Sequence, residues 1–137
     1  MKKIVIIDGQ GGKIGAQLID AIRERCEDAE IVAVGTNSIA TSNMLRSGPD
    51  AAATGENPVI VACRDADVIA GPIGIVIADA LYGEVTPAMA LAVGQSRAER
   101  VLIPVNKCGS MVVGVGDVPM AALIREAADC IADKVKK

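Results

Sequence analysis

Histidine is absent from this chain of 137 residues, as are phenylalanine and tryptophan. Without an imidazole, the chain cannot assemble a Ser-His-Asp or Cys-His catalytic centre or a histidine-ligated metal site. The four cysteines, Cys26, Cys63, Cys108 and Cys130, are widely spaced and form no C-x-x-C pair. We therefore interpret them as reduced thiols of a cytoplasmic protein and expect no metal site.

Basic clusters and long hydrophobic runs are scarce as well. The formal net charge is −3, and the only aromatic residue is Tyr82. Nucleic-acid-binding proteins usually carry a basic stripe and stacking aromatics, so we expect no nucleic-acid partner. The longest apolar tract, residues 68–78, is broken by glycine and proline and is too short to span a membrane. Asp8 interrupts the apolar start of the chain before a secretory signal would be complete.

The most informative feature is a glycine-rich segment that directly follows the first apolar run. Residues 4–7 are all Ile or Val, residues 8–15 read Asp-Gly-Gln-Gly-Gly-Lys-Ile-Gly, and an amphipathic stretch comes next. This order predicts a strand, a tight turn and a helix N-terminus. Backbone N–H groups and the helix dipole at such a turn favour an anion such as a phosphate.

The spacing of these glycines narrows the ligand class. The pattern G-x-G-x-x-G fails from Gly9, but Gly9, Gly12 and Gly15 fit a looser spacing found in some short-chain-reductase-like Rossmann proteins. A P-loop is disfavoured because Ile14 stands where a magnesium-binding hydroxyl is needed. In the alternative interpretation, the glycines serve only to let the helix pack closely on the sheet.

Apolar runs alternate with helical patterns along the chain. We expect strands at residues 4–7, 31–34, 51–54, 68–70 and 101–105, and a sixth strand at 111–115 is an open alternative. We expect helices at residues 13–27, 39–46, 58–63, 75–81, 88–93 and 119–135. Thr86 and Pro87 would start the helix at 88–93, as its cap and its first helical residue. This alternation predicts a single Rossmann-like α/β domain over residues 1–137. It would be a three-layer α/β/α sandwich with a mainly parallel sheet in the order 3-2-1-4-5.

In such a sheet, a ligand lies beyond the carboxyl ends of the strands, beside the first strand. The small and polar residues of this chain are concentrated in segments that follow the expected strands. The residues assigned to the binding site are Asp8, Gly9, Gln10, Gly11, Gly12, Lys13, Ile14, Gly15, Thr36, Asn37, Ser38, Thr54, Gly55, Glu56, Asn57, Gly71, Pro72, Ile73, Gly74 and Asn106.

The end of the second strand argues against an ordinary NAD or NADP site. A ribose-binding acid is typical there, but Thr36, Asn37 and Ser38 supply neither that acid nor an arginine for a 2′-phosphate. Asn37 and Ser38 either bind a ribose or phosphate weakly or only cap the following helix, and helix capping is the favoured role.

Two residues are candidates for catalysis. Glu56 falls in the first turn of an expected helix, where the dipole favours the ionised form, although an acid there is often only a solvated cap. Cys108 is the only cysteine expected in a loop, and Lys107 beside it would favour a thiolate; a free cysteine is otherwise a small buried hydrophobe. Asp8 is expected to hold the glycine turn through backbone N–H groups.

Several motifs together resemble a bacterial family known as domain of unknown function 3842. They are residues 7–12, 35–37, 39–41, 53–57, 71–75 and 103–106, together with Cys108. The resemblance extends over nearly the whole chain. It implies a small, stand-alone Rossmann-like protein and supplies no activity, substrate or catalytic residue.

We therefore expect a protein that binds or senses a nucleotide, a dinucleotide or another phosphorylated cofactor rather than converting it. One alternative is a small reductase or transferase that uses Glu56, Asn106 or Cys108. Another is a structural partner subunit without a ligand. Hydrophobic residues make up 51% of the chain, which favours a homo-oligomer such as a dimer. A sheet that is buried on both faces would raise hydropathy as well.

Overall fold

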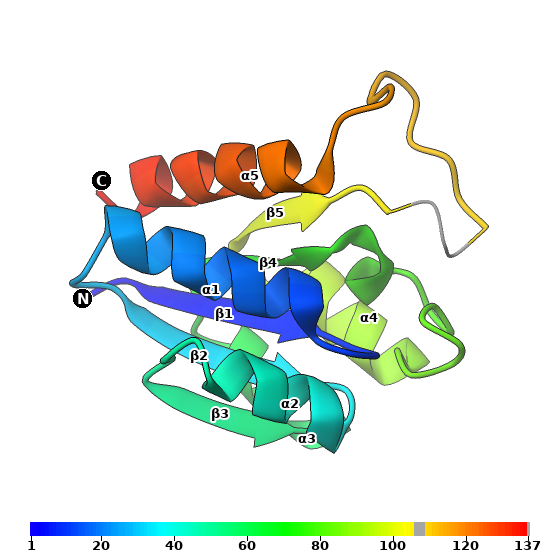
Figure 1. Cartoon of the computed structure of the whole chain (residues 1–137). Helices are drawn as coiled ribbons and strands as arrows, with labels where there is room; N and C mark the ends of the chain where they lie inside the picture. Colours follow the sequence, from blue (N-terminus) through cyan, green and yellow to red (C-terminus); the bar gives the residue numbers. More distant parts are fainter. Residues whose placement is uncertain (106–108, 137) are drawn as a thin grey trace.

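The computed structural model describes residues 1–105 and 109–136 of the chain. Parallel strands alternate with helices along the sequence (Figure 1). The elements are β1 (Lys3–Asp8), α1 (Lys13–Arg25), β2 (Glu30–Gly35), α2 (Ser38–Leu45), β3 (Ala51–Thr54), α3 (Glu56–Cys63), β4 (Val68–Pro72), η1 (Ile73–Val76), α4 (Pro87–Gln95), β5 (Glu99–Ile103) and α5 (Met120–Val135).

The strands form a five-stranded sheet in the order β3-β2-β1-β4-β5, which confirms the expected topology. All four strand pairs are parallel. β1 lies at the centre of the sheet, and its last residue, Asp8, is paired with Gly35 at the end of β2. The glycine turn therefore leaves the sheet between β2 and β4, where the strand order reverses. This place is the switch point of a fold of this kind.

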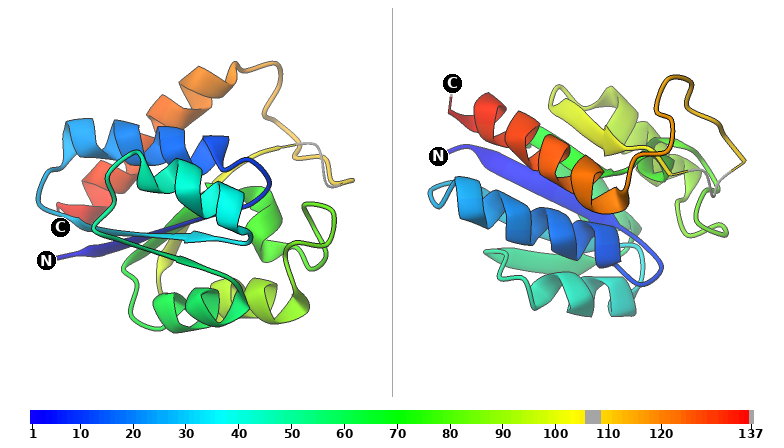
Figure 2. Two further views of the ribbon diagram at one scale, coloured as in Figure 1. Left: turned by 60° about the horizontal axis from the view of Figure 1, so that its bottom comes forward. Right: turned by 45° about the horizontal axis from the view of Figure 1, so that its top comes forward.

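Helices cover both faces of the sheet (Figure 2). On one face, Ile4 and Ile6 of β1 pack with residues of α1, α2 and α5. On the other face, Val5 and Ile7 pack with residues of α3 and α4. Successive side chains of a strand point to opposite faces, so a strand covered on both sides needs an uninterrupted apolar run. This packing explains the Ile-Val-Ile-Ile sequence of β1.

Two expected helix starts are confirmed. The Asn37 side chain caps α2 by accepting a hydrogen bond from the Ala40 N–H at 2.9 Å. Thr86 caps α4 by accepting from the Met89 N–H at 3.1 Å, and Pro87 opens the helix. Side-chain oxygens at these positions satisfy N–H groups that the first helical turn leaves unpaired.

One expected helix is wrong, and the alternative sixth strand is not formed. The helix at residues 75–81 is replaced by the short η1, after which Asp79, Leu81 and Tyr82 adopt left-handed backbone angles that end helical propagation. Residues 111–115 form no sixth strand, and their side chains include the exposed Met111 and Val113. Gly114 and Gly116 have positive φ angles, which interrupt the extended backbone that a strand needs.

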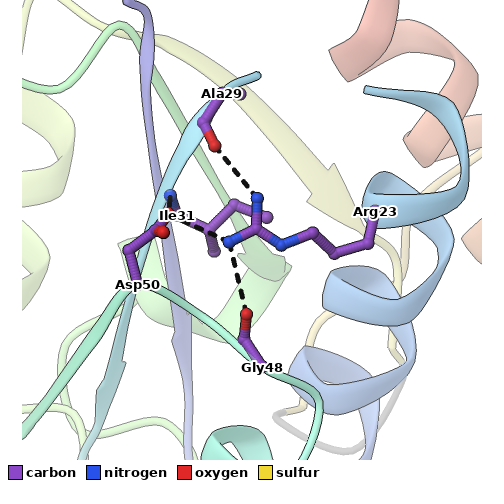
Figure 3. Close-up of polar contacts among 5 residues, drawn as sticks. All are labelled: Arg23, Ala29, Ile31, Gly48 and Asp50. Carbon is purple, nitrogen blue, oxygen red and sulfur yellow. Dashed lines mark hydrogen bonds and ion pairs between the residues drawn. The ribbon is translucent and has the colours of Figure 1, made fainter. Parts of the chain in front are cut away.

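Arg23 of α1 ties the helix to the opposite, amino-terminal end of the sheet (Figure 3). Its guanidinium donates to the carbonyls of Ala29 at 3.0 Å and Gly48 at 3.2 Å, and to Asp50 Oδ2 at 2.9 Å. Asp50 Oδ2 also accepts from the Ile31 N–H at 2.8 Å. This backbone hydrogen bond, followed by Arg23, lowers the pKa of Asp50. The cluster joins the segments before β2 and β3, so it orients α1 from the end remote from the glycine turn.

Candidate functional site

Asp8 holds the glycine turn in place through its buried carboxylate. It is 4% exposed, and its two carboxylate oxygens accept hydrogen bonds from the Gly9 N–H and the Gly15 N–H, each at 2.8 Å. Burial, together with the negative charge of Glu84, raises the pKa of Asp8 in spite of these hydrogen bonds. The expected anchoring role of Asp8 is confirmed. Both oxygens are engaged with backbone, so Asp8 acts as a structural anchor of the loop.

The glycines of the turn have different roles. A Cβ on Gly12 would lie 2.6 Å from the Ala40 carbonyl oxygen, and Gly12 has a φ of 71°. A Cβ on Gly15 would lie 2.5 Å from Met44 Sδ. These two glycines therefore let α1 approach α2. Gly11 differs, because a Cβ there would meet no atom within 4 Å.

Gly71 serves strand packing. A Cβ at this position in β4 would lie 2.1 Å from the Ile7 carbonyl oxygen of β1. No side chain fits there without separating the two strands. Gly71 was expected among the ligand-binding residues, and the structure provides a packing reason for it instead.

A cavity of about 380 Å³ opens beside the glycine turn. It lies between the start of α1, the end of β4 and the start of α5. Its lining residues are Asp8, Gly9, Gln10, Gly11, Gly12, Lys13, Ile14, Gln17, Pro72, Gly74, Leu81, Val105 and Met120. Its far wall is apolar, whereas the turn supplies backbone N–H groups. Within the described residues, the N–H groups of Gly11 and Lys13 donate to no acceptor.

A larger cavity, about 840 Å³, lies at the other end of the sheet. It is lined by residues that precede β1, β2 and β4, such as Lys2, Ala29 and Asp67, and by the ends of α1 and α5. Parallel α/β sheets bind ligands at the carboxyl ends of their strands. We therefore place the candidate site in the smaller cavity, which has the glycine turn on its wall.

The cavity brings together nine of the expected site residues, from Asp8 through Ile14 and at Pro72 and Gly74. Thr36 and Asn37 lie next to the turn without lining the cavity. Thr54 reaches Asn37 indirectly, because the Thr41 hydroxyl contacts Thr54 Oγ1 at 2.7 Å and donates to the Asn37 carbonyl at 3.1 Å. Gly15, Ser38, Gly55, Glu56, Asn57, Gly71 and Ile73 do not line the cavity.

Of the catalytic candidates, Glu56 alone lies among the described residues, and it does not line the cavity. Glu56 is exposed at the start of α3, beyond the edge strand β3. Asn106 and Cys108 lie outside the described residues. Of the described cysteines, Cys63 is buried, and burial raises the pKa of its thiol to about 11, which disfavours a reactive thiolate.

Sequence reasoning missed Glu84, which follows the incorrectly predicted helix. Its Oε1 accepts hydrogen bonds from the Gln10 N–H at 2.8 Å, the Thr36 hydroxyl at 2.6 Å and Asn37 Nδ2 at 2.7 Å. Partial burial raises the pKa of Glu84, but these three hydrogen bonds together lower it below its ordinary value. The only signal in the sequence was Gly83, a turn residue between the helices expected at 75–81 and 88–93.

None of the described helices is long and apolar enough to cross a membrane. Among the described residues, no three His, Cys, Asp or Glu side chains are grouped as metal ligands would be.

Comparison with known proteins places the chain in a family. Residues 3–136 match the family described as domain of unknown function (DUF3842). The chain belongs to the DUF3842 family. Curated protein sequences contain no match to this DUF3842 chain.

A solved structure resembles the DUF3842 fold over most of both chains. It is the dodecameric FMN-dependent Ubix-like decarboxylase from Escherichia coli O157:H7, at a TM-score of 0.54 and 15% sequence identity. The alignment covers 98% of the DUF3842 chain and 95% of the decarboxylase chain. At this identity the similarity establishes a common fold only.

Proposed function

We propose that this DUF3842 protein binds a phosphate-bearing ligand of the nucleotide class in the cavity beside the glycine turn. The main observation is that one cavity combines two backbone N–H groups without an acceptor among the described residues, those of Gly11 and Lys13, with an apolar wall. A phosphate would accept from these groups at the positive end of α1. A ring system would occupy the space between Pro72, Leu81 and Met120.

Charge and size support this assignment. Lys13 is exposed in the first turn of α1, where its ammonium group adds positive charge beside the open N–H groups. The cavity volume of about 380 Å³ lies at the small end of the range of about 300–1,000 Å³ for small-molecule sites. The FMN dependence of the Ubix-like decarboxylase makes flavin mononucleotide a natural first ligand to try.

The structural and catalytic alternatives account for less of the site. Helix packing accounts for Gly12 and Gly15 but not for Gly11, whose Cβ position faces open space. A catalytic role for Glu56 loses its geometric basis, because Glu56 does not line the cavity. Roles for Asn106 and Cys108 remain predictions. Binding without turnover is the function that the described residues support best.

We expect the Gly11→Val variant to fold normally and to lose ligand binding, because the valine side chain would fill the approach to the open N–H groups. For the wild type, FMN at about 100-fold above its Kd should raise the free energy of unfolding by about 2.7 kcal/mol. Thermal and urea denaturation with FMN, AMP, coenzyme A and inorganic phosphate measure this effect. Gly94→Ala is the matched control, since Gly94 of α4 also faces open space and lies outside the cavity.

A wild-type protein whose unfolding midpoint responds to none of these compounds would contradict the proposal. Equal stabilisation of the wild type and the Gly11→Val variant by a ligand would show that the ligand binds away from the turn.

Self-association is a separate prediction. Apolar side chains are exposed on α2, where Ile39 is 67% and Leu45 is 55% exposed, and Tyr82 is 96% exposed. We expect sedimentation velocity at micromolar concentration to show a homo-oligomer, because burying such side chains on association is favourable. We also expect Leu45→Glu to weaken the oligomer if α2 forms the interface. A single species of 14.0 kDa would contradict this prediction.

A further inference from the structure

We infer that Glu84 closes the β2 side of the glycine turn and thereby restricts the ligand to a single-phosphate mononucleotide, excluding dinucleotides. This inference rests on the proposed function, because it defines the ligand class of the same site. It comes from one side chain that reaches across the sheet from the segment after β4.

The Glu84 carboxylate accepts hydrogen bonds from the donors that the second nucleotide of a dinucleotide would need. In dinucleotide-binding Rossmann folds, the pyrophosphate lies on the glycine turn and the adenosine ribose meets the end of β2. Here the donors at that place are the Gln10 N–H, the Thr36 hydroxyl and the Asn37 amide. All three point at Glu84 Oε1, at 2.6–2.8 Å.

The space above Gly9 is filled as well. A Cβ built on Gly9 would lie 2.5 Å from Thr36 Oγ1, 2.8 Å from Leu81 Cδ1 and 2.9 Å from Glu84 Oε1. Leu81 and Glu84 thus cover the turn on its β2 side. Leu81 also lines the cavity, so it forms the wall between the covered side and the open side.

The segment that carries Glu84 is held in this position by its own backbone. Asp79 and Val85 are joined by a hydrogen bond of 2.7 Å from the Asp79 N–H to the Val85 carbonyl, and the Val85 N–H donates to the Ala80 carbonyl at 3.2 Å. Leu81 and Tyr82 have φ angles of 58° and 57°, which are rarely adopted by side-chain-bearing residues. Unfavourable backbone angles persist where surrounding contacts enforce them, and they are concentrated at ligand sites.

Electrostatics add to the steric closure. A second phosphate or a pyrophosphate on the β2 side would approach the ionised Glu84, and the buried Asp8 lies on the same turn. Like charges in such proximity oppose binding. On the other side of the turn, the Gly11 and Lys13 N–H groups and the apolar cavity remain accessible to one phosphate and one ring system.

FMN and FAD provide the direct comparison, because they share the same ring system and differ by the added adenosine monophosphate. We expect the wild type to bind FMN at least about tenfold more tightly than FAD, given the cost of placing like charges together. We expect Glu84→Ala to narrow this ratio by improving FAD affinity, with FMN affinity little changed. Glu84→Gln is the matched control: its amide oxygen can accept the same three hydrogen bonds, so it should keep the β2 side closed.

Amide NMR with inorganic phosphate tests the closure at single residues. In the wild type and in Glu84→Gln, phosphate should shift the Gly11 and Lys13 amide signals and leave the Gln10 signal in place. In Glu84→Ala, the Gln10 signal should shift too. If Glu84→Ala does not fold, the FMN-to-FAD ratio of the wild type decides alone.

The outcomes separate the two proposals. Wild-type affinities for FAD and FMN that are equal, or a wild-type Gln10 signal that follows phosphate as strongly as Gly11, would overturn the inference about Glu84 and leave the proposed function intact. The inference is also overturned if a folded Glu84→Ala protein keeps the wild-type ratio. Gly11 and Lys13 signals that respond to neither phosphate nor FMN would overturn the proposed function, and this inference with it.

Discussion

Replacing Gly12 by valine should unfold most of the protein or leave it with little of its stability. Gly12 has a φ of 71°, and a Cβ there would lie 2.6 Å from the Ala40 carbonyl oxygen and 2.8 Å from its Cα. The left-handed angle alone costs an L-residue about 1–2 kcal/mol. Forcing the backbone of α2 away adds about 1–3 kcal/mol or more, because backbone cannot yield as a flexible side chain can.

Urea denaturation followed by circular dichroism measures this loss. Gly11→Val is a close control, because it places the same side chain on the neighbouring glycine, where no atom lies within 4 Å. We expect the control to keep nearly the wild-type free energy of unfolding. Equal stability of both variants would contradict the close contact between Gly12 and the backbone of α2. A loss of ligand binding in Gly12→Val would not by itself identify a binding residue.

The second large effect is expected for Asp8→Ala. This change leaves the N–H groups of Gly9 and Gly15 without their buried acceptor, at a cost of about 1–3 kcal/mol for each. Removing the carboxylate also relieves the cost of burying a charge, so the net loss falls below the sum of the two. Asp20→Ala is the control, since Asp20 is exposed on the same helix. Equal unfolding free energies in both variants would exclude Asp8 as an anchor.

The pH dependence of stability gives Asp8 a signature of its own. Because burial raises the pKa of Asp8 above its ordinary 3.8, the folded protein binds this proton more tightly than the unfolded chain does. Stability from this group therefore declines as the pH rises from about 3.8 to the raised pKa, and the reduced contribution persists above it. Asp8→Asn should lack this decline.

Glu84 acts with the opposite sign. Its pKa is lowered from an ordinary 4.5, so its stabilising contribution is complete above pH 4.5 and is lost as the pH falls through the lowered pKa. The contributions of the two groups therefore change with pH in opposite directions, and subtracting the Asp8→Asn curve from the wild-type curve isolates the contribution of Asp8. A difference curve that rises with pH above about 3.8 would contradict the assignment.

The order of elements was readable from local patterns. The apolar run at residues 4–7 is followed by glycines and then by a helical pattern, so β1 and α1 are specified by neighbouring residues alone. Asn37 and Thr86 marked two helix starts for the same reason, since a cap bonds to an N–H only three residues away. The sheet order followed from the alternation of strands and helices.

Two local errors arose where apolar composition was mistaken for an element. Residues 75–81 have helix-forming alanine, leucine and isoleucine, but the chain turns there because Glu84 and Leu81 make contacts on the glycine turn. Residues 111–115 read Met-Val-Val-Gly-Val, a composition that suits a strand, yet they pair with no strand of the described sheet. In both places tertiary contacts, or their absence, outweighed local propensity.

By itself, the sequence determined the parallel α/β architecture, the anchoring of the turn by Asp8 and the position of the turn at the end of the central strand. These features depend on residues close together in the chain and on the period of apolar side chains. Only the tertiary structure decided which glycines serve packing and which one faces open space. Only the tertiary structure showed that Glu84, 74 positions after Gln10, binds the turn. Such pairings depend on how distant loops meet at one edge of the sheet, and no local pattern records them.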